Sequence, residues 1–285
     1  MLLDLLKAAI LGMVQGVTEF LPISSTGHLI LFEELLNVDQ DQYGLTFDAA
    51  LHLGTLLSVL WFFRTHWIAL LRVGLGSLRT RSLVDSESRL AWLIVLGTIP
   101  AAVIGLALED LAEDTFRSVV IVASMLIAFS AVFIVAEAFG RRTRSMADLS
   151  WGDAIIVGFA QALALVPGVS RSGATICAGL FRDVQRHEAA TFAFLLSAPI
   201  IAGAGLKKSV EVLRDFADGK LSGDDLAFFA VGFVVAALVG YASIKFLLQF
   251  LTNNSLHTFA AYRVLVGLVV FGALGWELVA SVTLA

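Results

Sequence analysis

The fold is decided by two short stretches of sequence, LPISSTGH at residues 21–28 and VPGVSRSG at residues 166–173. Each interrupts an otherwise apolar region, residues 3–36 and 153–181 respectively. Proline removes a helical donor, and glycine and serine favour turns, so each region is predicted to be helix, break, helix. In a membrane, non-helical backbone persists only where protein buries it or water reaches it. Each region is therefore expected to be a re-entrant hairpin lining a cavity.

The composition around these stretches is that of a polytopic membrane protein. Of 285 residues, 58% are hydrophobic and only 15% are charged, and the mean hydropathy is +0.88. Soluble domains average roughly 45–50% apolar and about 25% charged residues. A helix needs about 20 apolar residues to cross a bilayer. Stretches of this kind, each predicted to be a full span, lie at 45–63, 90–108, 117–137, 189–206, 226–250 and 260–283.

The two interrupted regions resemble each other. Gln15 precedes Gly27 by twelve residues, Gln161 precedes Gly173 by twelve, and a proline and two serines lie between in both. A Thr-Phe pair opens the next span after each region. We therefore expect an all-α polytopic membrane protein, one membrane domain over 1–285, with repeats at about 1–145 and 150–285. Each repeat would hold one re-entrant hairpin and three spans, which inverts the second repeat and makes the two breaks converge.

The distribution of Lys and Arg predicts the orientation. The loops at 64–89, 138–150 and 181–188 carry ten arginines, whereas the opposing loops carry five Lys or Arg and are rich in Asp and Glu. By the positive-inside rule the first set is cytoplasmic. The mouth of the first hairpin and both chain ends would then lie on the outer face, and the second hairpin would enter from the cytoplasm. The net charge of −5 offers no basic footprint for nucleic acid.

Ionisable side chains within the membrane segments are the candidate functional groups, because each costs about 2.5 kcal/mol or more to place there. At the breaks the ionisable candidates are Glu19, His28 and Arg171. The polar neighbours that complete the candidate site are Gln15, Ser24, Ser25 and Thr26 in the first region, and Ser170, Ser172 and Gly173 in the second. An arginine fork and turn amides suit a phosphate or diphosphate. A hydroxyl with a neighbouring base suits phosphoryl transfer. The residues alone leave open whether Ser25 attacks, with His28 or Glu19 as base, or whether His28 is itself the nucleophile.

Four further ionisable groups are less distinctive. Asp48 and His52 stand one helical turn apart, and the pattern fits a helix-end hydrogen bond as well as a functional role. Lys245 is expected to snorkel to the interface, and Arg263 is interpreted as a member of a structural ion pair.

At the two motifs the sequence resembles the integral-membrane undecaprenyl-diphosphate phosphatase family of bacteria. QGVTEFLPISSTGHL at 15–29 matches the first family motif and PGVSRSGAT at 167–175 matches the second, and the likeness extends over essentially the whole chain. It implies removal of the terminal phosphate from undecaprenyl diphosphate, which recycles the carrier lipid of cell-wall synthesis. It also implies bacitracin resistance, because bacitracin acts on the same lipid, and a location in the bacterial inner (plasma) membrane with the site facing the periplasm.

The resemblance also implies site residues and a cofactor. The family's catalytic positions correspond to Glu19, Ser25, His28 and Arg171, with Gln15, Ser24, Thr26, Ser170, Ser172 and Gly173 as substrate-binding neighbours. A divalent cation, Mg²⁺ or Ca²⁺, would bind near Glu19. Many relatives have Glu where this chain has Gln15, and an amide at that position cannot act as a base. The sequence leaves a homodimer open.

The sequence allows two rival interpretations. A lipid-phosphate transporter or flippase would use the same inverted repeats and a central arginine. The lipid phosphatases related to vanadium haloperoxidases expect a histidine at the position of Cys177 and a Lys-x6-Arg-Pro motif that this chain lacks. The second rival is therefore disfavoured.

Overall fold

The computed structural model describes residues 2–38, 44–80, 86–115, 118–218 and 221–283. This part of the chain is almost entirely helical and contains no named β-strand. Its α-helices are α1 (Leu2–Thr18), α2 (Ser25–Leu35), α3 (Gly44–Phe62), α4 (Arg64–Thr80), α5 (Ser86–Thr115), α6 (Val119–Phe139), α7 (Trp151–Ala162), α8 (Arg171–Phe181), α9 (Arg186–Ala217), α10 (Gly223–Asn253) and α11 (His257–Thr283). Two short 3-10 turns, η1 (Met146–Asp148) and η2 (Leu163–Leu165), flank α7.

Among the described residues, five helices are long and apolar enough to cross a membrane, namely α5, α6, α9, α10 and α11. They coincide with five of the six predicted spans. The sixth predicted span, 45–63, is α3, and it qualifies as a crossing only together with α4, from which it is bent by 77°. The multi-pass membrane class predicted from composition is therefore confirmed.

The prediction that 64–89 is a loop was wrong, because α4 occupies most of it. Ile68, Leu71, Leu75 and Leu78 recur at the spacing of one helical face, and all four are exposed. Three of the arginines that marked the segment as a loop, Arg64, Arg72 and Arg79, stand on this amphipathic helix, whose apolar stripe is exposed. Arg89 lies on α5, and Arg81 lies outside the described residues.

Both predicted breaks are present. α1 gives way to α2 through residues 19–24, and η2 gives way to α8 through residues 166–170. Each second helix is capped by a serine in the same unusual backbone conformation, Ser24 at φ 76° and Ser170 at φ 77°. Each cap hydroxyl accepts a hydrogen bond from the amide of the glycine three residues later. The Ser-x-x-Gly pattern of both motifs is thus a helix cap.

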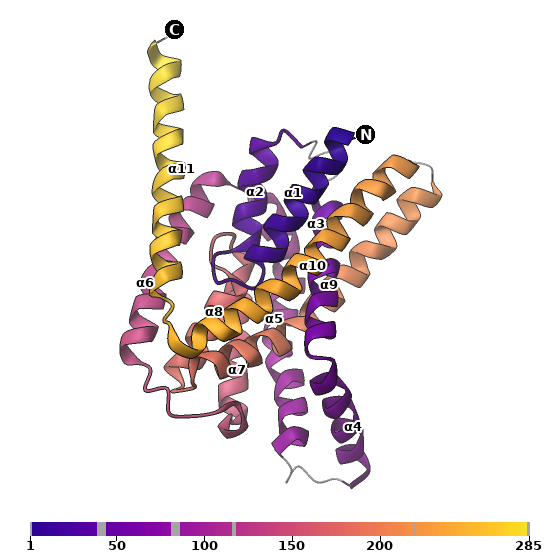
Figure 1. Ribbon diagram of the computed structural model, residues 1–285, viewed down its shortest axis with the longest axis vertical. Coiled ribbons are helices and arrows are strands. Elements are labelled where there is room, and N and C mark those ends of the chain that lie inside the picture. Colours follow the sequence, from indigo (N-terminus) through magenta and orange to yellow (C-terminus); the bar gives the residue numbers. More distant parts are fainter. Residues whose placement is uncertain (1, 39–43, 81–85, 116–117, 219–220, 284–285) are drawn as a thin grey trace.

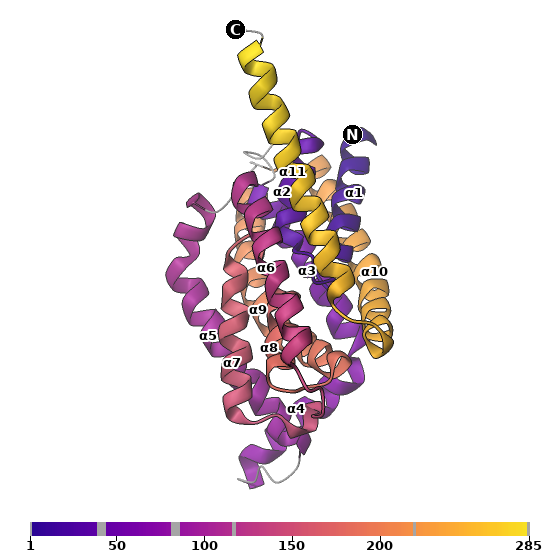
Figure 2. The ribbon, with the colours of Figure 1, turned by 90° about the vertical axis from the view of Figure 1, so that its left-hand side faces the viewer.

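Helices from the first half of the chain pack against helices from the second half. In Figures 1 and 2, α1 lies along α10 and α6 lies along α11, and α5 runs beside α7. Glycines allow the closest approaches: a Cβ on Gly158 would lie 2.3 Å from the carbonyl oxygen of Gly97, and one on Gly16 would lie 2.8 Å from the amide nitrogen of Gly240. Small residues let membrane helices approach in this way.

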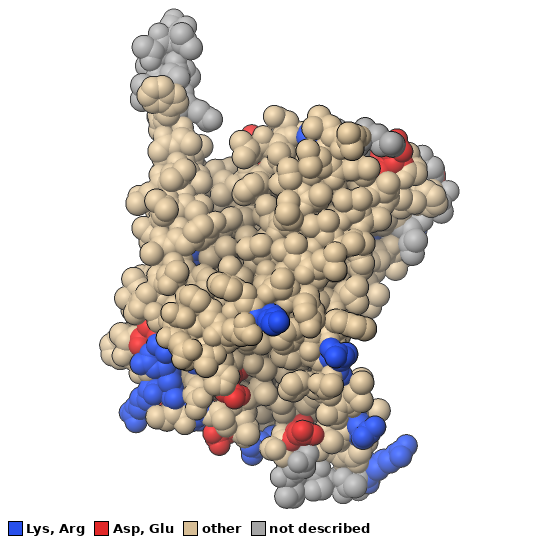
Figure 3. Space-filling model, viewed as in Figure 1, with Lys and Arg blue, Asp and Glu red and all other residues tan. Residues whose placement is uncertain are grey.

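Charge is concentrated at one end of the molecule. In Figure 3 most Lys and Arg side chains gather at the lower end, where α4 lies, and the middle of the visible face is free of Asp and Glu over a broad band. In Figure 1 both termini lie at the opposite, upper end. A wide band with no acidic and few basic side chains between more polar ends is what a bilayer-embedded protein presents.

Two buried carboxylates bind arginines from different segments at the arginine-rich end of the molecule. Asp153, at the start of α7, accepts hydrogen bonds from Arg144 at 2.7 Å and Arg182 at 2.6 Å. Glu137, at the end of α6, accepts from Arg142 and Arg186 and from the backbone amide of Leu256. Burial raises the pKa of Asp153, but hydrogen bonds from both arginines and Ser150 outweigh it and hold the pKa below its usual range.

Candidate active site

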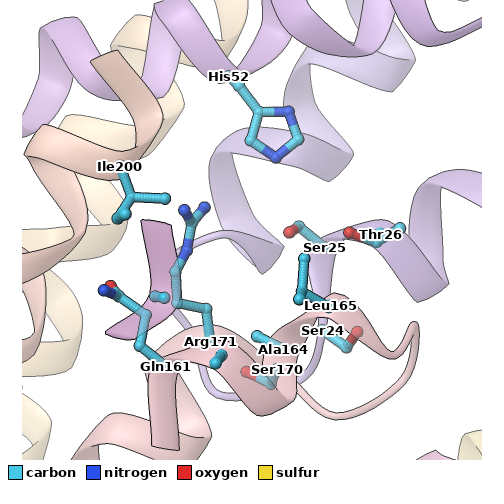
Figure 4. Close-up of a pocket in the computed structure, with 12 residues that line it drawn as sticks. Ser24, Ser25, Thr26, His52, Gln161, Ala164, Leu165, Ser170, Arg171 and Ile200 are labelled. Atoms are coloured by element: carbon cyan, nitrogen blue, oxygen red, sulfur yellow. The ribbon is translucent and has the colours of Figure 1, made fainter. Parts of the chain in front are cut away.

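The two breaks touch each other and border one cavity of about 180 Å³. A single water needs only about 10–15 Å³ on this measure, so the cavity has room for a phosphate-sized group. Its polar wall consists of Ser24, Ser25, Thr26, His52, Gln161, Ser170 and Arg171. In Figure 4 the side chains of Ser25, His52 and Arg171 point toward the same space from α2, α3 and α8.

Direct hydrogen bonds join the breaks. The Ser24 hydroxyl accepts from the Gly168 amide at 3.1 Å, and the Ser172 hydroxyl donates to the Leu21 carbonyl at 3.3 Å. The convergence expected from the repeated motifs is therefore a feature of the fold. Because α2 and α8 both begin at the cavity, the positive ends of two helix dipoles meet there, which favours an anion.

Glu19 lies directly behind the cavity wall and accepts hydrogen bonds from several polar side chains around it. Its side chain is 3% exposed and forms an ion pair with Arg171. Its second oxygen accepts from the Ser25 hydroxyl at 2.6 Å and from the Gln15 amide at 3.1 Å. One carboxylate therefore links a hydroxyl from the first break to a guanidinium from the second. The first-turn position of Ser25 on α2 directs its hydroxyl toward Glu19 across the break.

The sequence predicted only one of the two contacts that His52 makes. Its Nδ1 lies 2.7 Å from the Asp48 carbonyl, which is the local helix bond that the spacing suggested. A carbonyl can only accept, so Nδ1 carries a proton and Nε2 is left to face the site. Nε2 lies 3.6 Å from Glu19. The i, i+4 pattern could not reveal this, because the partner carboxylate lies on a different helix.

His28 is held away from the cavity. Its Nδ1 donates to the Ser24 carbonyl at 2.8 Å, so its Nε2 accepts from the Tyr262 hydroxyl at 2.9 Å. The two rings are stacked, with centroids 5.7 Å apart. Both nitrogens are therefore engaged, and Ser25 is hydrogen-bonded to Glu19 instead. His28 supports the backbone of the first break from behind.

Among the residues that the structure describes, Arg263 is the largest fully buried side chain, with 0% of its surface exposed. It donates to the carbonyl oxygens of Gly168 at 2.7 Å and Val169 at 3.2 Å in the second break, and to that of Pro22 at 3.4 Å in the first. The prediction of an ion pair was wrong. Among the described residues the partners of Arg263 are backbone carbonyls, the Ser130 hydroxyl and the rings of Phe129 and Phe133. Arg263 therefore ties both breaks together.

The remaining predicted residues fall into two groups. Ser24, Ser25, Thr26, Ser170 and Arg171 line the cavity. The others lie behind the wall: Gln15 on Glu19, Ser172 between Ser170 and Leu21, and Gly173 with its amide on the Ser170 hydroxyl. Only glycine fits at position 173, because a Cβ there would lie 2.5 Å from the Phe133 ring.

The site can supply only part of a cation's coordination. The described residues contain no group of three His, Cys, Asp or Glu able to hold a metal. However, the buried Oε1 of Gln15 has no hydrogen-bond partner there, and Gln15 lies one helical turn from Glu19. One carboxylate and one amide oxygen fit Mg²⁺ or Ca²⁺ if a bound phosphate supplies further oxygens.

Known proteins resemble this chain over most of its length. The family model for the bacitracin resistance protein BacA matches residues 8–269. An undecaprenyl-diphosphatase of Rubrobacter xylanophilus is 49% identical over 92% of this chain and 95% of its own length. The enzymes of the same name from Trichlorobacter lovleyi and Mycolicibacterium smegmatis are 44% and 40% identical, over 96% and 97% of this chain and 98% and 99% of theirs.

Proposed function

This chain belongs to the bacitracin resistance protein BacA family, and from that premise we propose that it hydrolyses undecaprenyl diphosphate to undecaprenyl phosphate and inorganic phosphate. The observation that carries the proposal is the meeting of Ser25, Glu19 and Arg171 at a cavity between the two breaks. An abundant enzyme would confer bacitracin resistance, since the antibiotic acts on the shared lipid.

Ser25 is the proposed nucleophile. Its hydroxyl donates to Glu19, so the carboxylate takes the proton as the oxygen attacks the terminal phosphorus. A bond forms between Ser25 Oγ and phosphorus, and the bond from phosphorus to the bridging oxygen breaks, which releases undecaprenyl phosphate. The proton on Glu19 leaves with undecaprenyl phosphate, so the carboxylate can take a proton from water. The water oxygen then bonds to phosphorus as the bond from phosphorus to Ser25 Oγ breaks, Glu19 returns this proton to Ser25 Oγ, and inorganic phosphate leaves. His28, which faces Tyr262, positions the break in this scheme.

Arg171 has two partners in the cycle. Before substrate enters, it neutralises Glu19. A diphosphate in the cavity competes for the guanidinium, and Arg171 then stabilises charge on the transferred phosphoryl group. Loss of its arginine partner makes Glu19 a stronger base as the substrate binds. The α2 and α8 N-termini add fixed positive potential at the same place.

A divalent cation fits the site together with the substrate. Glu19 would hold it, the Oε1 of Gln15 would join when the amide turns from the hydrogen bond that its Nε2 donates to Glu19, and phosphate oxygens would complete its coordination. When bound, the ion would offset the charge of the diphosphate. Because Gln15 is an amide, Glu19 alone provides the proton acceptor in this part of the site.

The proposed architecture is a pair of inverted repeats, each with one re-entrant hairpin. Three correspondences support it: Gln15 with Gln161, Ser24 with Ser170, and Gly27 with Gly173, with matched cap geometry at both serines. The packing supports it as well, because α1 of the first half lies on α10 of the second, and α7 of the second lies on α5 of the first. Such an exchange places both hairpins at the repeat interface.

The proposed location is the bacterial inner membrane, with the site open to the periplasm. The gathering of arginines at the end opposite both termini supports a cytoplasmic assignment for that end. The α1–α2 hairpin would then open outward. A homodimer remains a prediction from the sequence.

Phosphate release from undecaprenyl diphosphate by the purified protein in detergent tests the function. Wild type should release phosphate, and Ser25→Ala and Arg171→Ala should each lose at least about 100-fold in kcat. Thermal unfolding should stay near that of wild type for Ser25→Ala, whereas Arg171→Ala leaves the buried Glu19 without its cation and should unfold at a lower temperature. Gln249→Leu, an exposed change on α10, is the control that should retain activity. A well-folded wild type without phosphate release would favour the lipid-phosphate transporter instead.

A further inference from the structure

Gln161 is a polar residue of the cavity that the proposed reaction does not use. It stands near the end of α7, is only 3% exposed, and lines the cavity beside Arg171. Neither atom of its side-chain amide has a hydrogen-bond partner within the described parts of the chain. Buried amides are almost always paired, because an unpaired one destabilises the fold.

The repeat explains why the amide is unpaired. In the first half, Gln15 donates its amide to Glu19 one helical turn later. In the second half the corresponding position is Leu165, which lines the same cavity and offers no acceptor. Gln161 therefore matches the amide donor Gln15, but the second half has no carboxylate that corresponds to Glu19 and could accept its hydrogen bond. The acceptor for it must come from elsewhere.

The surroundings select an anionic acceptor. Arg171 lies beside Gln161, and the N-terminus of α8 faces the cavity, so the local potential is positive. In Figure 4, Ser25 lies on one side of Arg171, and Gln161 lies on the other with Ile200 nearby. A diphosphate whose terminal phosphorus lies near Ser25 would extend its second phosphate past Arg171 toward Gln161. Apolar Ile200 and Ala101 line the cavity as well, as the first carbons of a prenyl chain require.

We propose that Gln161 is a substrate-binding residue that donates its Nε2–H to the lipid-side phosphate of the prenyl diphosphate. The assignment rests on the proposed phosphatase function and deepens it, because it gives the diphosphate a direction in the cavity. The terminal phosphate lies toward Ser25, and the phosphate that stays on the lipid lies toward Gln161. Gln161 would thus favour diphosphates over monophosphates through the second phosphate.

Binding measured without turnover tests this assignment. Farnesyl diphosphate is titrated in detergent against Ser25→Ala protein and against the same protein carrying Gln161→Leu, Gln161→Glu or Gln249→Leu. One lost hydrogen bond to a charged group should weaken binding about tenfold for Gln161→Leu. Gln161→Glu, which faces the phosphate with a negative charge, should weaken it further. Gln249→Leu, the same change outside the cavity, should leave the Kd unchanged.

Thermal unfolding without ligand separates binding from a structural role. Gln161→Leu removes two unpaired polar atoms, so its melting temperature should equal or exceed that of the parent. An unchanged Kd, or a melting temperature that falls with the affinity, would overturn the assignment. Tighter binding by Gln161→Glu with Mg²⁺ present would overturn it too, by making the residue a cation ligand. If Gln161-dependent binding held while the wild type released no phosphate, the proposed function alone would fail.

Discussion

Replacing Arg263 by methionine should destabilise the protein substantially. The guanidinium donates to Gly168 at 2.7 Å and to Val169 at 3.2 Å, and neither carbonyl has another donor among the described hydrogen bonds. A buried carbonyl left unpaired costs about 1–3 kcal/mol. The two together cost about 2–6 kcal/mol, and removal of a buried cation from a poorly solvating site offsets part of this. We expect a net loss of about 3 kcal/mol.

For a domain of this size that loss corresponds to a melting temperature roughly 6–10 °C lower. The assay is thermal unfolding of the purified protein in detergent, with phosphate release measured on the same samples. Arg263→Lys, which keeps the charge but loses the fork, should fall between wild type and Arg263→Met. Lys245→Met, a change of an exposed cation on α10, is the control and should have little effect. A melting temperature for Arg263→Met within about 2 °C of wild type would refute this reasoning.

Three further outcomes are expected. Gly158→Ala should lower the melting temperature by overpacking of about 1–3 kcal/mol against Gly97, whereas Gly203→Ala, with open space around its Cα, should not. Asp153→Asn should lower the free energy of unfolding by about 2 kcal/mol near neutral pH. Because the pKa of Asp153 is lowered in the fold, the extra stability of wild type should disappear as the pH falls below about 4. Melting curves of both proteins across this pH range test this. EDTA should lower phosphate release, and added Mg²⁺ or Ca²⁺ should restore it; full activity in EDTA would exclude a required cation.

The spans and breaks could be predicted because hydropathy and local chemistry determine them. Long apolar runs allow few alternatives in a bilayer, and Pro, Gly and Ser interrupt a helix through their own backbone preferences. Helix α4 was not predicted, because the arginine content of 64–89 indicated a loop although its apolar residues recur at helical spacing.

The site was predictable to the extent that the motifs carry it. Glu19, Ser25 and Arg171 stand at the two interrupted stretches, and they meet because the two breaks contact each other. His52 and Arg263 stand outside them, on α3 and α11. Their partners lie on distant segments of the chain. Only the tertiary structure therefore reveals that His52 faces Glu19 and that Arg263 donates hydrogen bonds to both breaks.

The central claim is that Glu19 of the first break and Arg171 of the second act together at one site. A double-mutant cycle on kcat/KM for undecaprenyl diphosphate tests it, with Glu19→Gln, Arg171→Gln and the double variant. Residues that act as a unit are strongly non-additive, so the double variant should lose little more than the worse single variant. If the two losses multiplied, as they do for independent sites, the two breaks would not form one catalytic unit.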